Sequence, residues 1–340
     1  MDEGVDMGLV IPVFIAHQGC PHLCSFCNQH SISGASAGAL RPEDVGPIIE
    51  QWLDRSAYAE TVQVAFYGGS FTCLAQDYQK ELLAAVHPYL RQERVSSIRL
   101  STRPDCIDEK SCRFLRDNGV KTVELGVQSM SDVVLEKAGR GHDGQCSLDA
   151  LRLLHQSGFE VGVQLLIGLP HESRSSFLRG VYRLIDEGPD FFRLYPLLLV
   201  TGSELTRQYQ NGCYVPISLE LALILAARAK EIVETRGARV VRMGLQASDQ
   251  LECNLVAGPH HPAFGELVNS RLWLKRIRRA ARCFPKNRAV EIVISPRDQS
   301  AFWGQGGCNR VRLEQLEIAN RFQLKFDESL ARGTMKVCYL

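Results

Sequence analysis

The sequence predicts an α/β fold: a partial (βα)6 barrel of the TIM type, followed by a C-terminal α+β extension. Short apolar runs, as expected of buried parallel strands, alternate with helical patterns along the first part of the chain. The alternation repeats six times, and the pattern changes after Val200. We therefore expect a core barrel over residues 1–250 and an extension over residues 251–340.

The strands and helices of the barrel are expected in strict alternation. Each strand is short and mostly apolar, which is typical of a strand buried on both faces. The expected strands are Val13–His17, Val62–Tyr67, Ile98–Thr102, Val123–Val127, Val161–Ile167 and Phe192–Leu197. The expected helices are Pro42–Arg55, Gln79–Arg91, Glu109–Asn118, Ser147–Ser157 and Phe177–Asp186. Functional residues of such barrels lie on the loops after the strands.

The chain beyond the six repeats is expected to hold fewer regular elements. A helix is predicted over Leu219–Glu234 and a strand over Arg239–Met243. The extension then contains a loop rich in Gly, Pro and His, Ala257–Gly265, a basic helical stretch and a strand at Val290–Ile294. The glycines of Gly304–Gly307 lack the strand-to-helix setting of a nucleotide-binding fingerprint, so we interpret them as a turn.

The composition is that of an ordinary globular protein, with 45% hydrophobic and 23% charged residues. The 39 basic and 38 acidic residues nearly cancel, so the whole chain has no strong field to attract nucleic acid or an anionic membrane. Residues 1–8 do not read as a signal or transit peptide, and no apolar run reaches the roughly 20 residues of a membrane helix. We expect a cytoplasmic protein without a membrane partner.

Three of the twelve cysteines are clustered in the sequence. The other nine are scattered singly in a chain without a signal, which favours reduced thiols over a disulfide framework. Cys20, Cys24 and Cys27 form a C-x3-C-x2-C loop after the first expected strand. An iron–sulfur cube is normally held by four cysteines, so a cube held by three keeps one iron open. That iron can chelate the amine and carboxylate of S-adenosylmethionine, whose carbon–sulfur bond one electron can break.

A zinc site is the alternative interpretation of the same loop. Three cysteines and one histidine at short spacings commonly bind zinc, and His17, His22 and His30 are the available fourth ligands. The position of the loop after the first strand of a βα series, together with Phe26 before the third cysteine, resembles the radical S-adenosylmethionine (SAM) superfamily. This resemblance implies a barrel of the radical SAM type, with a [4Fe–4S] cluster on the three cysteines and SAM as cofactor.

Further polar positions at strand ends extend the resemblance. It implies that Gly68 and Gly69, which follow the second expected strand, meet the methionine amine of SAM, although a Gly pair there is also a common tight turn. Ser101, Gln128, Arg140 and Gln164 match cofactor contacts of the oxygen-independent coproporphyrinogen oxidases. Ser101 stands where that family has a carboxylate and Gln164 where it has an aspartate. The alternative interpretation has no ligand. Gln128 and Gln164 would then be inward side chains hydrogen-bonded to neighbouring residues, and Arg140 would be a solvated loop residue.

The sequence more closely resembles the catalytic subunit of Elongator and its stand-alone bacterial relatives. The stretches that carry this likeness are Thr102–Asp105, Glu124–Ser129, Arg140–His142, Arg242–Gln246 and Ala257–Val268. The Elongator subunit spaces its first two cysteines more widely and continues into an acetyltransferase domain, for which we find no counterpart before Leu340. The resemblance therefore implies radical chemistry and an RNA-facing surface, with acetyl transfer left open.

A basic stretch in the extension is the candidate RNA-binding surface. Arg271–Arg288 carries eight positive charges, including Lys286, and no acidic residue. Its apolar residues are spaced for an amphipathic helix with one cationic face, which would bind phosphates in a salt-dependent manner. The alternative is a solvated helix paired with nearby acids.

The leading hypothesis is a radical SAM enzyme that abstracts hydrogen from an unidentified substrate, for which a tRNA nucleotide is the candidate. A one-electron donor such as flavodoxin or ferredoxin would reduce the cluster. Tetrapyrrole oxidation of the coproporphyrinogen type is a second enzymatic hypothesis. A zinc-stabilised RNA-binding module is the non-catalytic one. The sequence does not identify a catalytic residue, the oligomeric state or a second cluster.

Overall fold

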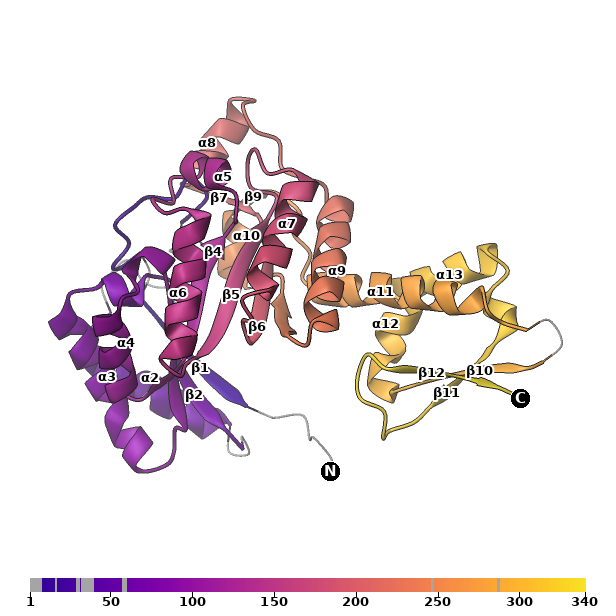
Figure 1. Ribbon diagram of the computed structural model, residues 1–340, viewed down its shortest axis with the longest axis horizontal. Helices are drawn as coiled ribbons and strands as arrows, with labels where there is room; N and C mark the ends of the chain where they lie inside the picture. Colours follow the sequence, from indigo (N-terminus) through magenta and orange to yellow (C-terminus); the bar gives the residue numbers. More distant parts are fainter. Residues whose placement is uncertain are drawn as a thin grey trace. The chain divides into compact units, whose positions relative to one another are not determined.

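The structure is a computed structural model that describes residues 8–15, 17–28, 31, 40–56, 60–245, 248–285 and 288–340. His30, Gln246, Lys286 and the N-terminal residues 1–7, all used in the sequence predictions, lie outside the described residues. The chain forms two compact units (Figure 1). The first contains residues 1–218 and 229–260, and the second contains residues 219–228 and 261–340. The sequence-based domain boundary between residues 250 and 251 stays a prediction.

The first unit is built on a seven-stranded sheet whose neighbouring strands are all parallel. The strand order is β1-β2-β3-β4-β5-β6-β8. The strands are β1 (Leu9–Phe14), β2 (Val62–Tyr67), β3 (Ser97–Thr102), β4 (Val120–Gln128), β5 (Glu160–Ile167), β6 (Phe191–Pro196) and β8 (Arg239–Met243). The prediction of a partial parallel barrel is confirmed. The strand predicted at Arg239–Met243 joins the same sheet as its seventh member, next to β6.

Helices lie between and after these strands in the chain. They are α2 (Pro42–Arg55), α3 (Gln76–Arg91), α4 (Glu109–Asp117), α5 (Asp132–Lys137), α6 (Gly144–Gln156), α7 (Arg174–Ile185), α8 (Glu204–Gln210), α9 (Leu219–Thr235) and α10 (Asp249–Asn254). Local signals start several of them. Pro42 occupies the first turn of α2, and Asp108 caps α4 by accepting a 2.7 Å hydrogen bond from the backbone of Ser111. No helix in the described residues is long and apolar enough to cross a bilayer.

The first strand begins four residues and ends three residues earlier than predicted. The prediction placed it at Val13–His17, whereas Leu9–Phe14 pairs in register with Val62–Tyr67 of β2. His17 has a left-handed φ of 57° and already belongs to the turn that leads to the cysteines. Pro12 made residues 9–14 a poor strand candidate in the sequence. It is tolerated because β1 is an edge strand, where a missing N–H need not break a ladder on both sides.

The second unit has the predicted α+β composition. Its sheet has the order β11-β10-β12, with β10 (Val290–Ile294) between β11 (Gln323–Phe326) and β12 (Met335–Tyr339). The helices are α11 (Phe264–Ala281), α12 (Gln299–Trp303) and α13 (Cys308–Gln315). Trp273, Ile277, Ile292, Phe302 and Leu313 are buried together between helices and sheet. Alternate residues of β10 face this core, which is why its sequence reads as a clear strand.

One disulfide departs from the prediction of reduced thiols. Cys73 and Cys106 are bonded, with their Cα atoms 5.6 Å apart. The bond links two 3₁₀ turns, η1 (Phe71–Cys73) after β2 and η2 (Pro104–Cys106) after β3. The prediction is therefore wrong for this pair, because the fold brings together two cysteines that are 33 residues apart in the sequence. Cys20 and Cys24 are not disulfide-bonded.

Candidate functional site

The cysteine loop is docked at the carboxyl edge of the parallel sheet by neighbouring loops. The backbone N–H of Ser25 donates to the carbonyl of Ala138 (3.0 Å), and the N–H of Leu205 donates to the carbonyl of Ser25 (2.7 Å). Phe26 packs on a buried apolar cluster that includes Ala138, Leu169 and Leu205. The aromatic residue that helped to identify the motif thus anchors the loop from its apolar side.

Two buried guanidinium groups meet the sulfur of Cys24. Nη1 of Arg140 lies 3.3 Å from Cys24 Sγ, and Nη1 of Arg103 lies 4.0 Å from it. The exposed fractions of Arg140 and Arg103 are only 6% and 2%, so Arg140 is not the solvated loop residue of the alternative interpretation. Cys24 is therefore the thiol of the motif that lies beside two buried positive charges.

Gly68 and Gly69 bring the loop after β2 against the backbone that leads into Cys20. A Cβ on Gly69 would lie 2.5 Å from the carbonyl oxygens of Ile15 and Gln18, a distance that a side chain cannot occupy. The N–H of Ser70 donates to Gln18 O (3.0 Å), and Ser70 Oγ lies 3.3 Å from Cys20 Sγ. The absence of a side chain at Gly69 therefore allows a close backbone contact that aligns the cysteine loop. A contact between Gly69 and a ligand stays a prediction.

Gln128 and Arg140 present buried polar atoms without partners. Gln128 ends β4 with a left-handed φ of 69°, and its Oε1 is buried without a hydrogen-bond partner among the described residues. Arg140 Nε is buried and unpartnered in the same sense. Both side chains border the space left by the missing Cβ of Gly126. Unpaired buried polar atoms are costly in a folded protein, so an acceptor and a donor left open here are suited to binding a polar ligand.

Ser101 and Gln164, by contrast, already have protein partners. Ser101 Oγ donates to the carbonyl of Phe66 over 3.4 Å. Gln164 Nε2 donates to Glu124 Oε2 over 2.8 Å. The contact of Gln164 is the one expected from the alternative interpretation, in which this inward side chain is hydrogen-bonded to a neighbouring residue.

A buried ionic network around Glu124 was not anticipated from the sequence. The carboxylate of Glu124 has no exposed surface and accepts hydrogen bonds from Tyr67 OH (2.9 Å), Arg99 Nη1 (3.1 Å) and Arg193 Nη2 (2.9 Å). Burial, and next the charge of Glu124, raises the pKa of the Tyr67 phenol. The sequence feature that could have indicated this network is the presence of single polar residues inside apolar strands. Only the sheet order shows that these residues meet.

Two further titratable groups follow β4 and β5. Ser129 Oγ donates to Glu172 Oε1 over 2.5 Å, while Glu172 Oε2 is buried without a partner among the described residues. Burial raises the pKa of Glu172 to about 7. Burial, and next the charge of Arg140, lowers the pKa of His142 to about 4, so its ring is neutral at pH 7. Neither residue was selected by the sequence analysis.

The described residues contain no group of three or more His, Cys, Asp or Glu side chains close enough to hold a metal ion. The cluster on Cys20, Cys24 and Cys27 and the alternative zinc site both stay predictions. A Cβ on Gly141 would lie only 2.2 Å from Nε2 of His22, so that ring rests against the loop at Gly141. The donor chemistry still fits an iron–sulfur cluster, because three thiols share one short loop beside buried cationic groups.

Comparisons with known proteins identify the family of the chain. The family model for the radical SAM superfamily matches residues 14–179, and that for the radical SAM C-terminal domain matches residues 189–273. The tRNA uridine(34) acetyltransferase of Methanocaldococcus infernus is 30% identical over 314 residues, and that of Methanocaldococcus jannaschii is 31% identical over 298 residues. These alignments cover 81% and 76% of this chain but only 58% and 54% of the relatives, so the chain spans little more than half their length.

A solved structure shows the same fold. The archaeal Elp3 of Methanocaldococcus infernus, with residues 1–46 deleted, superposes with a TM-score of 0.57 at 22% sequence identity. The superposition covers 73% of this chain and 62% of that one. Two matching family models over most of the chain, and the Elp3-like relatives, lead to one assignment: the chain is an enzyme of the radical SAM superfamily.

Proposed function

We propose that Cys20, Cys24 and Cys27 hold a [4Fe–4S] cluster and that the enzyme cleaves SAM to abstract a hydrogen atom from a nucleotide of tRNA. The observation that carries the proposal is the convergence of Arg140 and Arg103 on Cys24 Sγ, at 3.3 and 4.0 Å. When bound, the cluster supplies the single electron that breaks the carbon–sulfur bond of SAM. Gly69 and Ser70 align the start of the cysteine loop, and the buried guanidinium groups of Arg140 and Arg103 lie beside Cys24 Sγ.

The cofactor would lie against the polar atoms that have no protein partner. Gln128 Oε1 would accept a hydrogen bond from the SAM amine or ribose, and Arg140 Nε would be the donor available to its carboxylate. Gly68 offers backbone groups at the end of β2. Ser101 and Gln164 remain in the proposed cofactor site on resemblance alone, and each would share its present contact with Phe66 or Glu124.

The proposed RNA surface is a stripe of cations on α11. Lys275, Arg278, Arg279 and Arg282 follow the spacing i, i+3, i+4 and i+7, and all four are exposed. Arg278, Arg279 and Arg282 form no ion pair with any described residue, whereas Arg271 is paired with Glu220 at 2.6 Å. The three arginines of the stripe are therefore suited to bind a polyphosphate backbone.

The name of the relatives suggests the substrate nucleotide. Proteins named tRNA uridine(34) acetyltransferase share 30–31% identity with this chain, so we place a tRNA uridine first among the substrates to test. We further propose a cytoplasmic protein reduced by flavodoxin or ferredoxin. Coproporphyrinogen oxidation would be detected in parallel by a tetrapyrrole assay.

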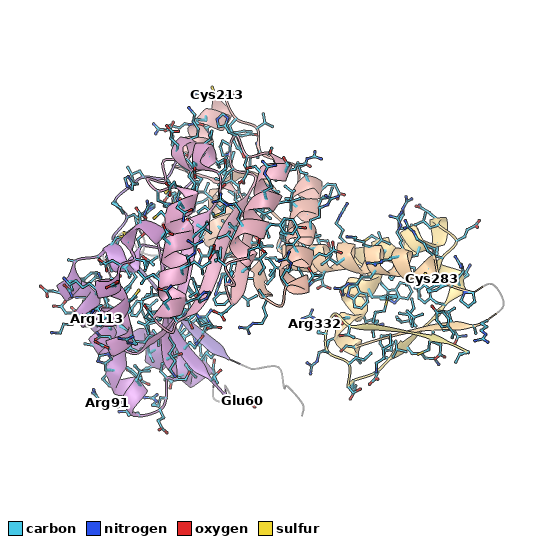
Figure 2. The ribbon with its side chains drawn as sticks, in the orientation of Figure 1. Glu60, Arg91, Arg113, Cys213, Cys283 and Arg332 are labelled. Carbon is cyan, nitrogen blue, oxygen red and sulfur yellow. A yellow bond between two sulfur atoms is a disulfide. The ribbon has the colours of Figure 1, made fainter. Side chains whose placement is uncertain are left out.

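The test is anaerobic reconstitution. Iron and sulfide are counted, then dithionite and SAM are added and 5′-deoxyadenosine is measured by chromatography. We expect about four irons per chain and deoxyadenosine formation, both lost in Cys24→Ala. Cys213→Ala is the matched control, because Cys213 is a free, exposed cysteine outside the motif (Figure 2). Zinc in place of iron, or a cluster that never cleaves SAM, would refute the proposal.

A further inference from the structure

The backbone of Arg103, which directly follows β3, is held by contacts of the residues on both sides of it. Thr102, which ends the strand, has its Oγ1 2.6 Å from Oγ1 of Thr72. Pro104 and Cys106 then form the 3₁₀ turn η2, in which the N–H of Cys106 donates to the carbonyl of Arg103 (3.3 Å). Cys106 is in turn bonded to Cys73. The backbone of Arg103 therefore has little freedom.

The guanidinium of Arg103 joins three groups of the candidate site. Its Nε and Nη2 each donate to a carboxylate oxygen of Asp105 over 2.9 Å, which is the two-pronged geometry of a strong charged pair. Nη2 also donates to the backbone carbonyl of Arg140, and Nη1 points to Cys24 Sγ at 4.0 Å. Arg103 thus holds the main chain of the residue whose own guanidinium lies nearest to Cys24.

The charges around Cys24 do not cancel. Arg103 and Arg140 contribute two positive charges in a buried setting, Asp105 contributes one negative charge, and His142 is neutral because burial and Arg140 lower its pKa. Arg140, the nearer of the two guanidinium groups to Cys24 Sγ, forms no ion pair with any described carboxylate. Hydrogen bonds to ligand sulfurs and nearby charge are two of the factors that set the reduction potential of an iron–sulfur cluster.

We propose that Arg103 is a positioning residue that holds Arg140 against Cys24 and, with it, raises the reduction potential of the cluster. The inference rests on the proposed function, since it requires a cluster on Cys24. Asp105 orients Arg103 and belongs to the same unit. Contact between Arg103 and SAM is not part of the proposal, because its donors are already directed to Asp105, Arg140 and Cys24.

The experiment uses four anaerobically reconstituted proteins: the parent chain, Arg103→Lys, Arg103→Gln/Asp105→Asn and Arg113→Gln. The double variant removes both members of the Arg103–Asp105 pair, so Asp105 is not left without its partner and the net charge near Cys24 does not change. Arg113→Gln replaces an exposed arginine of α4 and is the control for an arginine substitution away from the candidate site (Figure 2). Iron content, the thermal unfolding midpoint and the cluster potential, by dye titration with electron paramagnetic resonance, are measured for each.

We expect the double variant to load iron and to shift its reduction equilibrium about tenfold toward the oxidised cluster, which is about 59 mV for one electron. Arg103→Lys retains the positive charge but loses the two-pronged guanidinium geometry. We therefore expect the reduction potential of its cluster to lie between those of the parent and the double variant. Arg113→Gln leaves the potential unchanged.

A double variant with the parent's potential and spectrum, and only a lower unfolding midpoint, would show that Arg103 is merely structural and overturn the inference. Should the parent chain itself fail to bind iron, the proposed function fails first. The two failures are therefore told apart by the parent protein. If the double variant does not fold, Arg103→Lys decides, because an unchanged potential in that variant also overturns the inference.

Discussion

Tyr67 donates its phenolic hydrogen to Glu124 over 2.9 Å, which ties the end of β2 to the middle of β4. Arg193 reaches both residues, with Nη2 3.0 Å from Tyr67 OH and 2.9 Å from Glu124 Oε1. Arg99, from β3, completes a group that links four strands of the sheet. A fully buried carboxylate is stable only with such partners, so the group also fixes the relative positions of the strands whose ends form the candidate site.

Glu124→Gln should therefore destabilise the chain by about 3–5 kcal/mol, because it leaves the guanidinium groups of Arg99 and Arg193 buried without their carboxylate. Urea unfolding measures the loss. Glu50→Gln is the control, since Glu50 forms an exposed pair with Arg94 at 2.7 Å and such pairs contribute about 0–1 kcal/mol. Equal losses in the two variants would show that the network has no special role in stability.

The strands of the sheet were easier to predict from the sequence than the buried polar contacts between them. The strand at Val62–Tyr67 was predicted at its observed bounds, because an apolar run on a buried parallel strand is a local signal. Arg99 and Arg193 each appear in the sequence as one polar residue within an apolar run, which has no obvious partner. Their meeting at Glu124 depends on strand order and register, which are long-range properties.

The cysteine motif was recognisable because its three chemical groups lie within one short loop. Arg103 and Glu172 were missed for the opposite reason. The contact of Arg103 with Cys24 spans 79 residues, and that of Glu172 with Ser129 spans 43. Gln164 is a further long-range case. The sequence analysis selected it as a cofactor contact, whereas in the structure it donates a hydrogen bond to Glu124 on the neighbouring strand.

Gly69→Ala should displace the cysteine loop, because the new Cβ would lie 2.5 Å from two backbone carbonyl oxygens. We expect a lower thermal midpoint and at least a several-fold loss of reconstituted iron. Gly46→Ala is the matched control. Its Cβ would meet Tyr89 OH at 3.4 Å, and an alanine inside α2 should be neutral or stabilise by up to about 1 kcal/mol. Parent-like iron content in Gly69→Ala would contradict a role for this close contact.

The pH dependence of stability should reveal Glu172. Burial raises its folded pKa to about 7 from an ordinary value of 4.5, so the folded chain holds this proton more tightly than the unfolded chain. The resulting stabilisation is present in full below pH 4.5 and is lost as the pH rises to about 7, with a total of about 3 kcal/mol.

Glu172→Gln retains an acceptor for Ser129 Oγ and cannot ionise. Urea unfolding at pH 5, 6, 7 and 8 should therefore show a stability that falls more steeply with pH in the parent chain than in the variant, and the variant should be the more stable protein at pH 8. Parallel profiles for the two proteins would mean that Glu172 has no raised pKa.

Replacement of Arg278, Arg279 and Arg282 by glutamine should weaken binding of tRNA and reduce its salt dependence. Each lost phosphate contact lowers the slope of log K against log salt by about one, so three contacts would lower it by about three. Binding is measured by fluorescence anisotropy between about 50 and 200 mM salt. The control replaces Arg113, Arg116 and Lys110 of α4, which removes the same charge from another helix. If both triple variants lose affinity equally, the attraction comes from overall charge, and α11 is not a specific RNA surface.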